Sequence, residues 1–492
     1  MIFQFFIVLG TSLIAYLYTV RNCKFVIDDQ EGIANYDGKI KNKSYYDYIK
    51  HFWYVMAGKN PARHHWFSVV LQMGVCGLLY LFLGDLFGYD LAFWATMLFA
   101  VHPINTQAVA WISARGYPLG LFFLLISLQI PKIASYYPIL KTFPIVSDVI
   151  FSGVFLWATI SQFTIMATFP VLLQLGYINL SILSFIIMLG SGAWLLHDII
   201  KNRTNTFKEQ AMDKGTKFNW RKPIVAVKTI FYYTQLCIFP AHMGIYHKWG
   251  YHYNDNIERE DKLFWAGLAL LIGLGVLFVF GNSCVRFGIV WYLSYLFIFL
   301  NWITIHQFVS ERYCYIANIG LCIILANYLL PYPIIIAFII GLYLMRTWQH
   351  LPTYCEEIRF YMSNIWNFPD SEVAMANLGV ILMRGGLIGM AIDYWTMATK
   401  INPDYDVPFY NLYSTLKVRG DFHKARVNLV SAISAPTCHF REMWTKELEN
   451  FDKELLKNKD KLQPWQVPME LRTKIIDTAG NIIEVPVVKA TT

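Results

Sequence analysis

Long apolar stretches without a charged residue dominate the first two thirds of the chain. A helix that spans a bilayer needs about 20 such residues. The stretches are 1–20, 66–84, 91–114, 149–196, 263–285, 287–310 and 313–345. We expect two spans in 149–196, two short spans in 313–345 broken at Pro331 and Pro333, and one more over 116–131. Residues 229–241 are predicted to be re-entrant or interfacial. The pattern predicts a membrane domain over 1–346 with about ten or eleven transmembrane helices.

A spacing of about 34 residues follows the last apolar stretch. The recurring pairs are Leu378 and Leu412, Leu382 and Leu416, Gly386 and Gly420, Ala391 and Ala425, and Ala398 and Ala432. This period, with small residues where two helices cross and Pro403 after the first unit, is typical of tetratricopeptide repeats. We predict a short α-solenoid over 347–435, formed by a half-repeat and two full repeats. We expect a capping helix over 436–462 and a tail over 463–492 that forms a hairpin or binds a partner.

Composition agrees with an all-α polytopic membrane protein. Of 492 residues, 56% are hydrophobic and only 15% are charged, which excludes an ordinary soluble domain. The net charge of +8 is concentrated in a basic loop over 201–228, which the positive-inside rule places in the cytoplasm. The chain lacks the basic domain and stacking platform that nucleic-acid binding requires. The eight cysteines have neither C-x-x-C nor zinc spacing, so we predict no metal site, and most lie in or beside spans as apolar fillers.

Charged and polar residues at the edges of apolar stretches are the candidates for chemistry, because such positions are costly. Asp28 and Asp29 follow the first span, in an extramembrane loop over 21–65. Adjacent carboxylates repel each other, which raises one pKa toward that of a usable general base. An ordinary solvated loop is the alternative.

Two further groups stand at such edges. His102 and Arg115 close the third apolar stretch and could hold a phosphate. Alternatively, His102 could be a helix-end residue and Arg115 a snorkelling side chain.

Glu311 and Arg312 lie between two apolar runs, where each must be neutralised by the other or by a ligand. A structural ion pair is the alternative.

In order and sequence these segments resemble the transmembrane-and-tetratricopeptide O-mannosyltransferases (the TMTC family) and their bacterial relatives, which are GT-C glycosyltransferases. The resemblance covers about residues 20–435. Its motifs are FVIDD at 25–29, HPINTQAVAWISAR at 102–115, SERYCYIANIG at 310–320 and, less specifically, Phe239-Pro240. The resemblance implies a GT-C-like membrane bundle and, as substrate, a polyprenyl-phosphate sugar that carries mannose in this family. No cofactor is implied, and the use of a divalent metal is left open.

The resemblance also implies roles for individual residues. Asp28 would be the catalytic base and Asp29 would orient or assist it. His102, Arg115 and Arg312 would contact the lipid phosphate, with Glu311 holding Arg312. The repeats would bind an acceptor polypeptide through their concave face.

The chain departs from the family at three positions. Gln107 stands where the family usually has Glu, Ser161-Gln162-Phe163 where it has Ser-Lys-Glu, and Ala317 where it has Pro. The alternative function is therefore a catalytically degenerate relative that serves as a structural or assembly subunit and binds a partner subunit through its repeats. A transporter is a weaker alternative, because the span centres carry almost no charge.

The resemblance and the charge distribution disagree about the orientation of the chain in the membrane. The resemblance places the Asp28–Asp29 loop and the repeats on the non-cytoplasmic side of the endoplasmic reticulum or of a bacterial inner membrane. Residues 21–65 nevertheless carry several Lys and Arg, which the positive-inside rule would place in the cytoplasm. Aromatic residues alternate with the lysines between Lys39 and Lys59, and this pattern favours amphipathic interfacial helices. We follow the resemblance.

Overall fold

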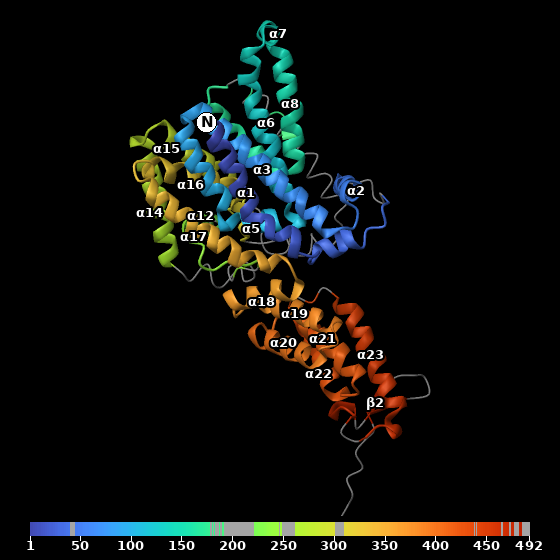
Figure 1. The fold of residues 1–492 in the computed structure, drawn as a ribbon. Helices are drawn as coiled ribbons and strands as arrows, with labels where there is room; N and C mark the ends of the chain where they lie inside the picture. Colours follow the sequence, from blue (N-terminus) through green and yellow to red (C-terminus); the bar gives the residue numbers. More distant parts are fainter. Residues whose placement is uncertain are drawn as a thin grey trace, which may run out of the picture. The chain divides into compact units, whose positions relative to one another are not determined.

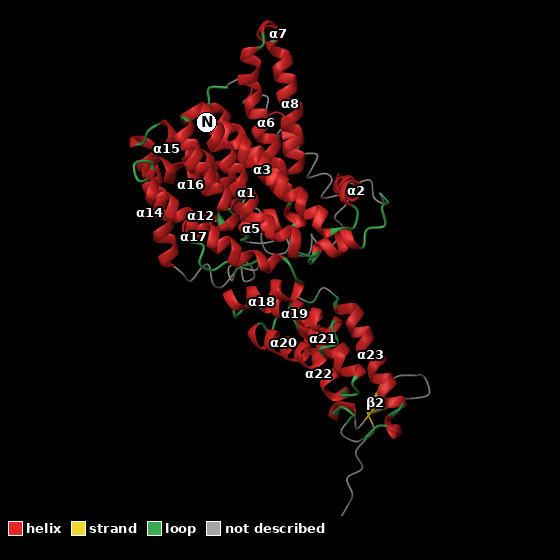
Figure 2. Ribbon diagram, in the orientation of Figure 1, coloured by secondary structure: helices red, strands yellow, loops and turns green. Residues whose placement is uncertain are grey.

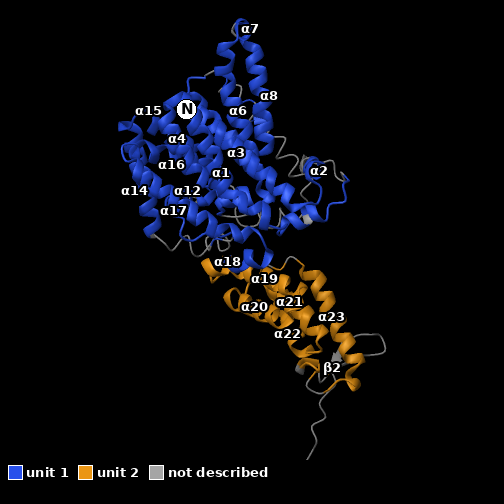
Figure 3. Cartoon of the chain, viewed as in Figure 1, with its two compact units in different colours: residues 1–363 blue, residues 364–492 orange. Residues whose placement is uncertain are grey.

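The computed structural model describes most of the chain. The described residues are 1–39, 45–177, 221–245, 261–300, 309–436, 438, 440–463, 466–471, 474–476 and 482–484, with isolated positions between 180 and 190 and at 247. The chain forms two compact units, Met1–Ser363 and Asn364–Thr492 (Figure 3). Each unit is described by itself.

Unit 1 is helical throughout its described part (Figures 1 and 2). Its helices are α1 (Ile2–Asn22), α2 (Tyr45–Ala57), α3 (Pro61–Phe87), α4 (Tyr89–Val101), α5 (Thr106–Ala110), α6 (Gly116–Tyr136), α7 (Pro138–Thr142), α8 (Pro144–Ser161), α9 (Phe169–Gln174), α12 (Arg221–Ile238), α14 (Asp261–Phe280), α15 (Ser283–Phe297), α16 (Cys314–Leu329) and α17 (Pro333–His350). Helix α18 (Glu357–Asn367) continues from unit 1 into unit 2.

Seven helical segments of the described residues are long and apolar enough to cross a membrane. They are Ile2–Asn22, Pro61–Phe87, Ile112–Tyr136, Pro144–Ser161, Lys262–Phe280, Glu311–Leu329 and Pro333–Tyr354, and four shorter apolar helices accompany them. The break predicted at Pro331 and Pro333 separates α16 from α17. The architecture is that of an all-helical, multi-pass membrane protein.

Several predicted boundaries differ from the structure. The uncharged stretch ends before Arg346, but α17 continues to His350, and the Arg346 side chain donates hydrogen bonds to the carbonyls of Pro240 and Ala241. Unit 1 accordingly extends to residue 363. Helix α12 includes the end of the predicted basic loop, whose residues 201–220 lie outside the described part. Most of the second span predicted in 149–196 also lies outside it.

Glycines allow some helices of unit 1 to approach closely. A Cβ atom at Gly320 of α16 would collide with the carbonyl oxygen of Gly288 in α15, and one at Gly288 would lie 2.7 Å from that of Gly320. Small residues at such crossings bring helix backbones together in membranes. Gly120 of α6 similarly leaves room for Gln162 at the end of α8, in the α6–α7–α8 hairpin (Figure 1).

Unit 2 begins with two helical hairpins. Their helices are α19 (Glu372–Arg384), α20 (Ile388–Ile401), α21 (Asp406–Val418) and α22 (Phe422–Ser434). Both hairpins turn at a glycine with φ of 79°, Gly386 in one and Gly420 in the other. At each turn the next residue donates its N–H to a carbonyl five residues earlier, which is the Schellman termination that glycine favours. Ala391, Ala398, Ala425 and Ala432 are completely buried.

Helix α23 (Arg441–Lys457) packs on the second hairpin. The Trp444 ring stacks on Tyr410 with 4.4 Å between centroids, and Glu447 accepts hydrogen bonds from the hydroxyls of Tyr410 and Tyr413. Two short strands follow, β1 (Lys474–Ile476) and β2 (Ile482–Glu484). They pair antiparallel with Ile475 opposite Ile483, the hairpin that the sequence pattern offered as one alternative.

Candidate functional site

The two adjacent aspartates have different environments. Asp28 is exposed, whereas Asp29 is 1% exposed. They follow an extended segment after α1, and the chain then enters a π-helical turn, Gln30–Ala34. Phe25 and Ile33 pack on Ile112 and so attach this loop to the 102–115 segment. One carboxylate is therefore accessible while the other belongs to the interior.

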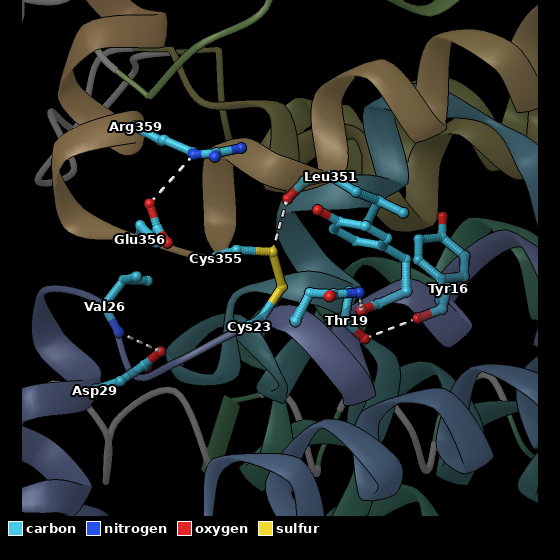
Figure 4. The surroundings of a disulfide bond; sticks show 11 residues. Tyr16, Thr19, Cys23, Val26, Asp29, Leu351, Cys355, Glu356 and Arg359 are labelled. Carbon is cyan, nitrogen blue, oxygen red and sulfur yellow. Dashed lines mark hydrogen bonds and ion pairs between the residues drawn. A yellow bond between two sulfur atoms is a disulfide. The ribbon is translucent and has the colours of Figure 1, made fainter.

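Residues that precede α6 bind the buried carboxylate. Ser113 donates its backbone N–H to Oδ1 of Asp29 at 2.8 Å, and its hydroxyl donates to the same oxygen. The Val26 N–H approaches Oδ2 at 3.5 Å (Figure 4). Burial raises the pKa of the Asp29 carboxyl to about 7, although these hydrogen bonds and the nearby Arg115 guanidinium act in the opposite direction. Asp29 can therefore exchange a proton near neutral pH.

Arg115 is also buried, and α3 provides most of its contacts. Its Nε donates to the Ser68 hydroxyl at 3.1 Å, and Nη2 donates to the His64 carbonyl at 3.0 Å. The Trp53 ring of α2 covers its guanidinium carbon at 4.2 Å. Only Nη1 lacks a protein partner in the described part of the chain. Arg115 could thus offer one donor to an anion, but not the two parallel donors of a bidentate contact.

Gln107 joins the 102–115 segment to the 310–312 segment. Its Oε1 accepts hydrogen bonds from the Ser310 hydroxyl at 2.9 Å and from the Arg312 backbone N–H at 2.8 Å. The Arg312 guanidinium carbon lies 5.0 Å from the Trp111 ring and 5.5 Å from the Tyr313 ring. Arg312 as a whole residue is half-buried, whereas Arg115 is buried.

Glu311 does not have the partner that was predicted for it. In the part of the chain that the structure describes, it forms no ion pair with Arg312. Its Oε1 accepts the Gly244 N–H, and its Oε2 lies 3.3 Å from Nε2 of His350 and 3.4 Å from the Tyr354 hydroxyl. The two neighbouring side chains have different surroundings. Glu311 is completely buried, and the Arg312 guanidinium lies beside the Trp111 ring. Glu311 thus contacts the end of α17 and does not hold Arg312.

Both ring nitrogens of His102 form hydrogen bonds with backbone groups. Its Nδ1 accepts the Ile104 N–H at 3.2 Å, so the ring is neutral and Nε2 donates to the Cys237 carbonyl at 2.6 Å. The ring also packs on Tyr343. With both nitrogens engaged, His102 terminates α4 and is not free to bind a phosphate, which corrects the predicted role.

A disulfide that the sequence analysis missed lies beside the acidic loop. Cys23, directly after α1, is bonded to Cys355, which is 332 positions away (Figure 4). A signal was present, because Cys23, Cys355 and Cys438 are the cysteines that lie outside the uncharged stretches and the predicted re-entrant segment 229–241. Spacing alone could not have paired them.

No protein-family model and no curated protein matches this chain. The structure joins the 25–29 and 102–115 motifs through Asp29 and Ser113, and the 102–115 and 310–320 motifs through Gln107.

Proposed function

We propose that the chain is an integral-membrane glycosyltransferase. It transfers a sugar, mannose by the resemblance, from a polyprenyl phosphate to a Ser or Thr hydroxyl of a secreted or membrane protein. The observation that carries the proposal is the hydrogen-bonded linkage of three motifs that are distant in sequence. Ser113 donates to Asp29 across 84 positions, and Arg312 donates to Gln107 across 205 positions.

The reaction assigns a role to each accessible group. The acceptor hydroxyl oxygen attacks the anomeric carbon, the bond from that carbon to the phosphate oxygen breaks, and polyprenyl phosphate leaves. Asp28 takes the hydroxyl proton as general base. Asp29, held by Ser113, orients the loop. Arg312 stabilises the charge that develops on the departing phosphate, and Nη1 of Arg115 adds a single donor.

The disulfide supports placing this chemistry on the non-cytoplasmic side. Disulfides persist in the endoplasmic reticulum lumen, the periplasm and other oxidising compartments. Cys23 follows the first spanning helix and lies five residues before Asp28. The disulfide therefore favours the orientation that the resemblance implies over the cytoplasmic placement that the Lys and Arg of residues 21–65 would predict.

Unit 2 is proposed to bind the acceptor polypeptide as a short tetratricopeptide array. The matched glycine turns at Gly386 and Gly420 and the buried alanines where the helices cross support this assignment. Among the described residues no candidate span follows Pro333–Tyr354, so unit 2 would be exposed to the same compartment as Cys355.

Transfer by the purified full-length protein tests the proposal. Radiolabelled polyprenyl-phosphate mannose and Ser/Thr-containing peptides from secreted proteins would be the substrates. We expect Asp28→Asn to lower kcat by a factor of about 100 or more, because removal of a general base typically costs that much. Asp90→Asn changes an exposed carboxylate at the start of α4 and should have no effect. Equal transfer by wild-type protein and Asp28→Asn would exclude Asp28 as the base.

A second candidate function is a catalytically inactive assembly subunit, and the neutral side chains at 107 and 162 favour it. Gln107 is completely buried, and Gln162 packs against Gly116 and Gly120, so both serve the packing of the fold. Co-purification of a stoichiometric partner, with no transfer to any peptide tested, would favour this function.

A further inference from the structure

The backbone directly before the two aspartates has an unusual conformation. Ile27 has φ of 49°, and among the described residues it is the one non-glycine position with positive φ. A β-branched side chain is strongly disfavoured in this left-handed region. Such a conformation persists only where surrounding contacts determine it.

Three links from one segment hold the backbone before Asp28. Cys23 is bonded to Cys355, and the Lys24 N–H donates to the Cys355 carbonyl at 3.1 Å. The Ile27 N–H donates to Oε1 of Glu357 at 3.1 Å, although 330 positions separate the two residues. Glu357 thus contacts the residue that has the left-handed conformation.

The bend at Ile27 sets the direction of both carboxylates. Beyond it the Asp29 N–H donates to the Val26 carbonyl at 3.0 Å, and the Gln30 N–H donates to the Ile27 carbonyl at 2.9 Å. If Ile27 relaxed to an ordinary conformation, this turn would open. The change would reorient the exposed Asp28 and separate Asp29 from Ser113.

We propose that Glu357 is a positioning residue for Asp28 and Asp29, because its carboxylate holds the left-handed bend at Ile27. Glu357 stands in the first turn of α18, the helix through which the chain leaves unit 1. The consequence for catalysis rests on the proposed function, whereas the effect on the loop does not.

Hydrogen exchange of the full-length protein in detergent tests the effect on the loop. We expect Glu357→Ala to accelerate exchange of the 26–30 amides about tenfold, the factor that corresponds to one net hydrogen bond. Glu357→Asp keeps the charge, but its side chain is shorter by one methylene group and its oxygens no longer reach the Ile27 N–H. It should therefore also accelerate exchange. Glu357→Gln keeps an acceptor oxygen and should exchange like wild type. Glu356→Ala is the matched control, because Glu356 is exposed and pairs with Arg359.

Transfer activity gives a second readout. Glu357→Ala and Glu357→Asp should lower kcat about tenfold with little change in the KM for donor, and Glu357→Gln should restore it, as expected for loss of a positioning hydrogen bond. Unchanged exchange in both Glu357→Ala and Glu357→Asp would overturn the proposal, whatever the activity. If exchange accelerates and wild-type protein transfers no sugar, the loop assignment stands and the proposed function fails. If exchange accelerates while transfer is unchanged, the positioning role is overturned.

Discussion

Ser113 donates both its backbone N–H and its hydroxyl to one carboxylate oxygen of Asp29, a residue 84 positions earlier in the chain. This pair attaches the loop after the first span to the segment before α6. Because the bonded oxygen is buried, the protonation state of Asp29 should affect both stability and activity.

Asp29 should make the protein less stable as the pH rises toward neutrality. Burial raises the pKa of Asp29 to about 7, above the unfolded value of about 3.9. Between these values the folded state retains a proton that the unfolded state has lost. The stabilisation that this proton provides is therefore fully present below about pH 4. The free energy of unfolding then falls by up to about 4 kcal/mol as the pH rises through about 7.

Thermal melting of the full-length protein between pH 4 and pH 8 measures this effect. Asp29→Asn keeps an acceptor oxygen but cannot ionise, so it should flatten the decline in Tm. Ser113→Ala removes one bond to the charged form, so it should raise the pKa and move the decline to higher pH. An identical decline in wild-type protein and Asp29→Asn would assign it to other groups.

Gln107→Ala should destabilise unit 1 by about 1–3 kcal/mol, because the Ser310 hydroxyl and the Arg312 N–H would lose their buried acceptor. Gln107→Glu retains oxygens for both donors but places a carboxylate at a completely buried position, so it should also destabilise unit 1. Thermal melting would compare these variants with Gln235→Ala, an exposed position on α12. If Gln107→Ala lowers Tm no more than Gln235→Ala does, the hydrogen bonds of Gln107 contribute nothing to stability.

Removal of the disulfide by Cys23→Ser should lower Tm, by an amount equivalent to about 2–5 kcal/mol. Cys355→Ser should have the same effect, and the double variant should be no worse than either single variant, because one bond is lost in each case. Cys438→Ser, which changes a free thiol of unit 2, serves as the control. Labelling of Cys23 by a thiol reagent without prior reduction would contradict the assignment.

A partly buried ion pair joins α23 to the second hairpin of unit 2. Nε of Arg426 lies 2.8 Å from Oδ1 of Asp452, and Nη2 lies 2.9 Å from Oδ2. Arg426→Ala would remove both hydrogen bonds to the Asp452 carboxylate and should cost about 1–3 kcal/mol. Lys424→Ala breaks an exposed pair with Asp421 and should cost less than about 1 kcal/mol. Hydrogen exchange of the α22 and α23 amides would measure the loss of stability in each variant. Equal protection of these amides in Arg426→Ala and Lys424→Ala would contradict the predicted difference.

Features that depend on a few neighbouring residues could be predicted from the sequence. Uncharged stretches of sufficient length predict membrane helices wherever they occur, because unsatisfied backbone groups are too costly in lipid. Pro331 and Pro333 predicted the break between α16 and α17, since proline interrupts helical hydrogen bonding. Gly386 and Gly420, which the 34-residue spacing paired, both end helices in the structure because glycine adopts positive φ without steric cost. The tetratricopeptide assignment remains a prediction.

The roles of individual polar residues depended on partners that no local pattern reveals. Adjacent in sequence, Asp28 and Asp29 differ because Ser113, 84 positions from Asp29, binds one of them and not the other. Glu311 contacts His350, 39 positions away, instead of the neighbouring Arg312, whose guanidinium lies beside Trp111. Chain topology alone brought Cys23 to Cys355 and Ile27 to Glu357. Hydrophobic periodicity depends on local geometry, whereas hydrogen bonds and disulfides require atoms that only the folded chain brings within reach.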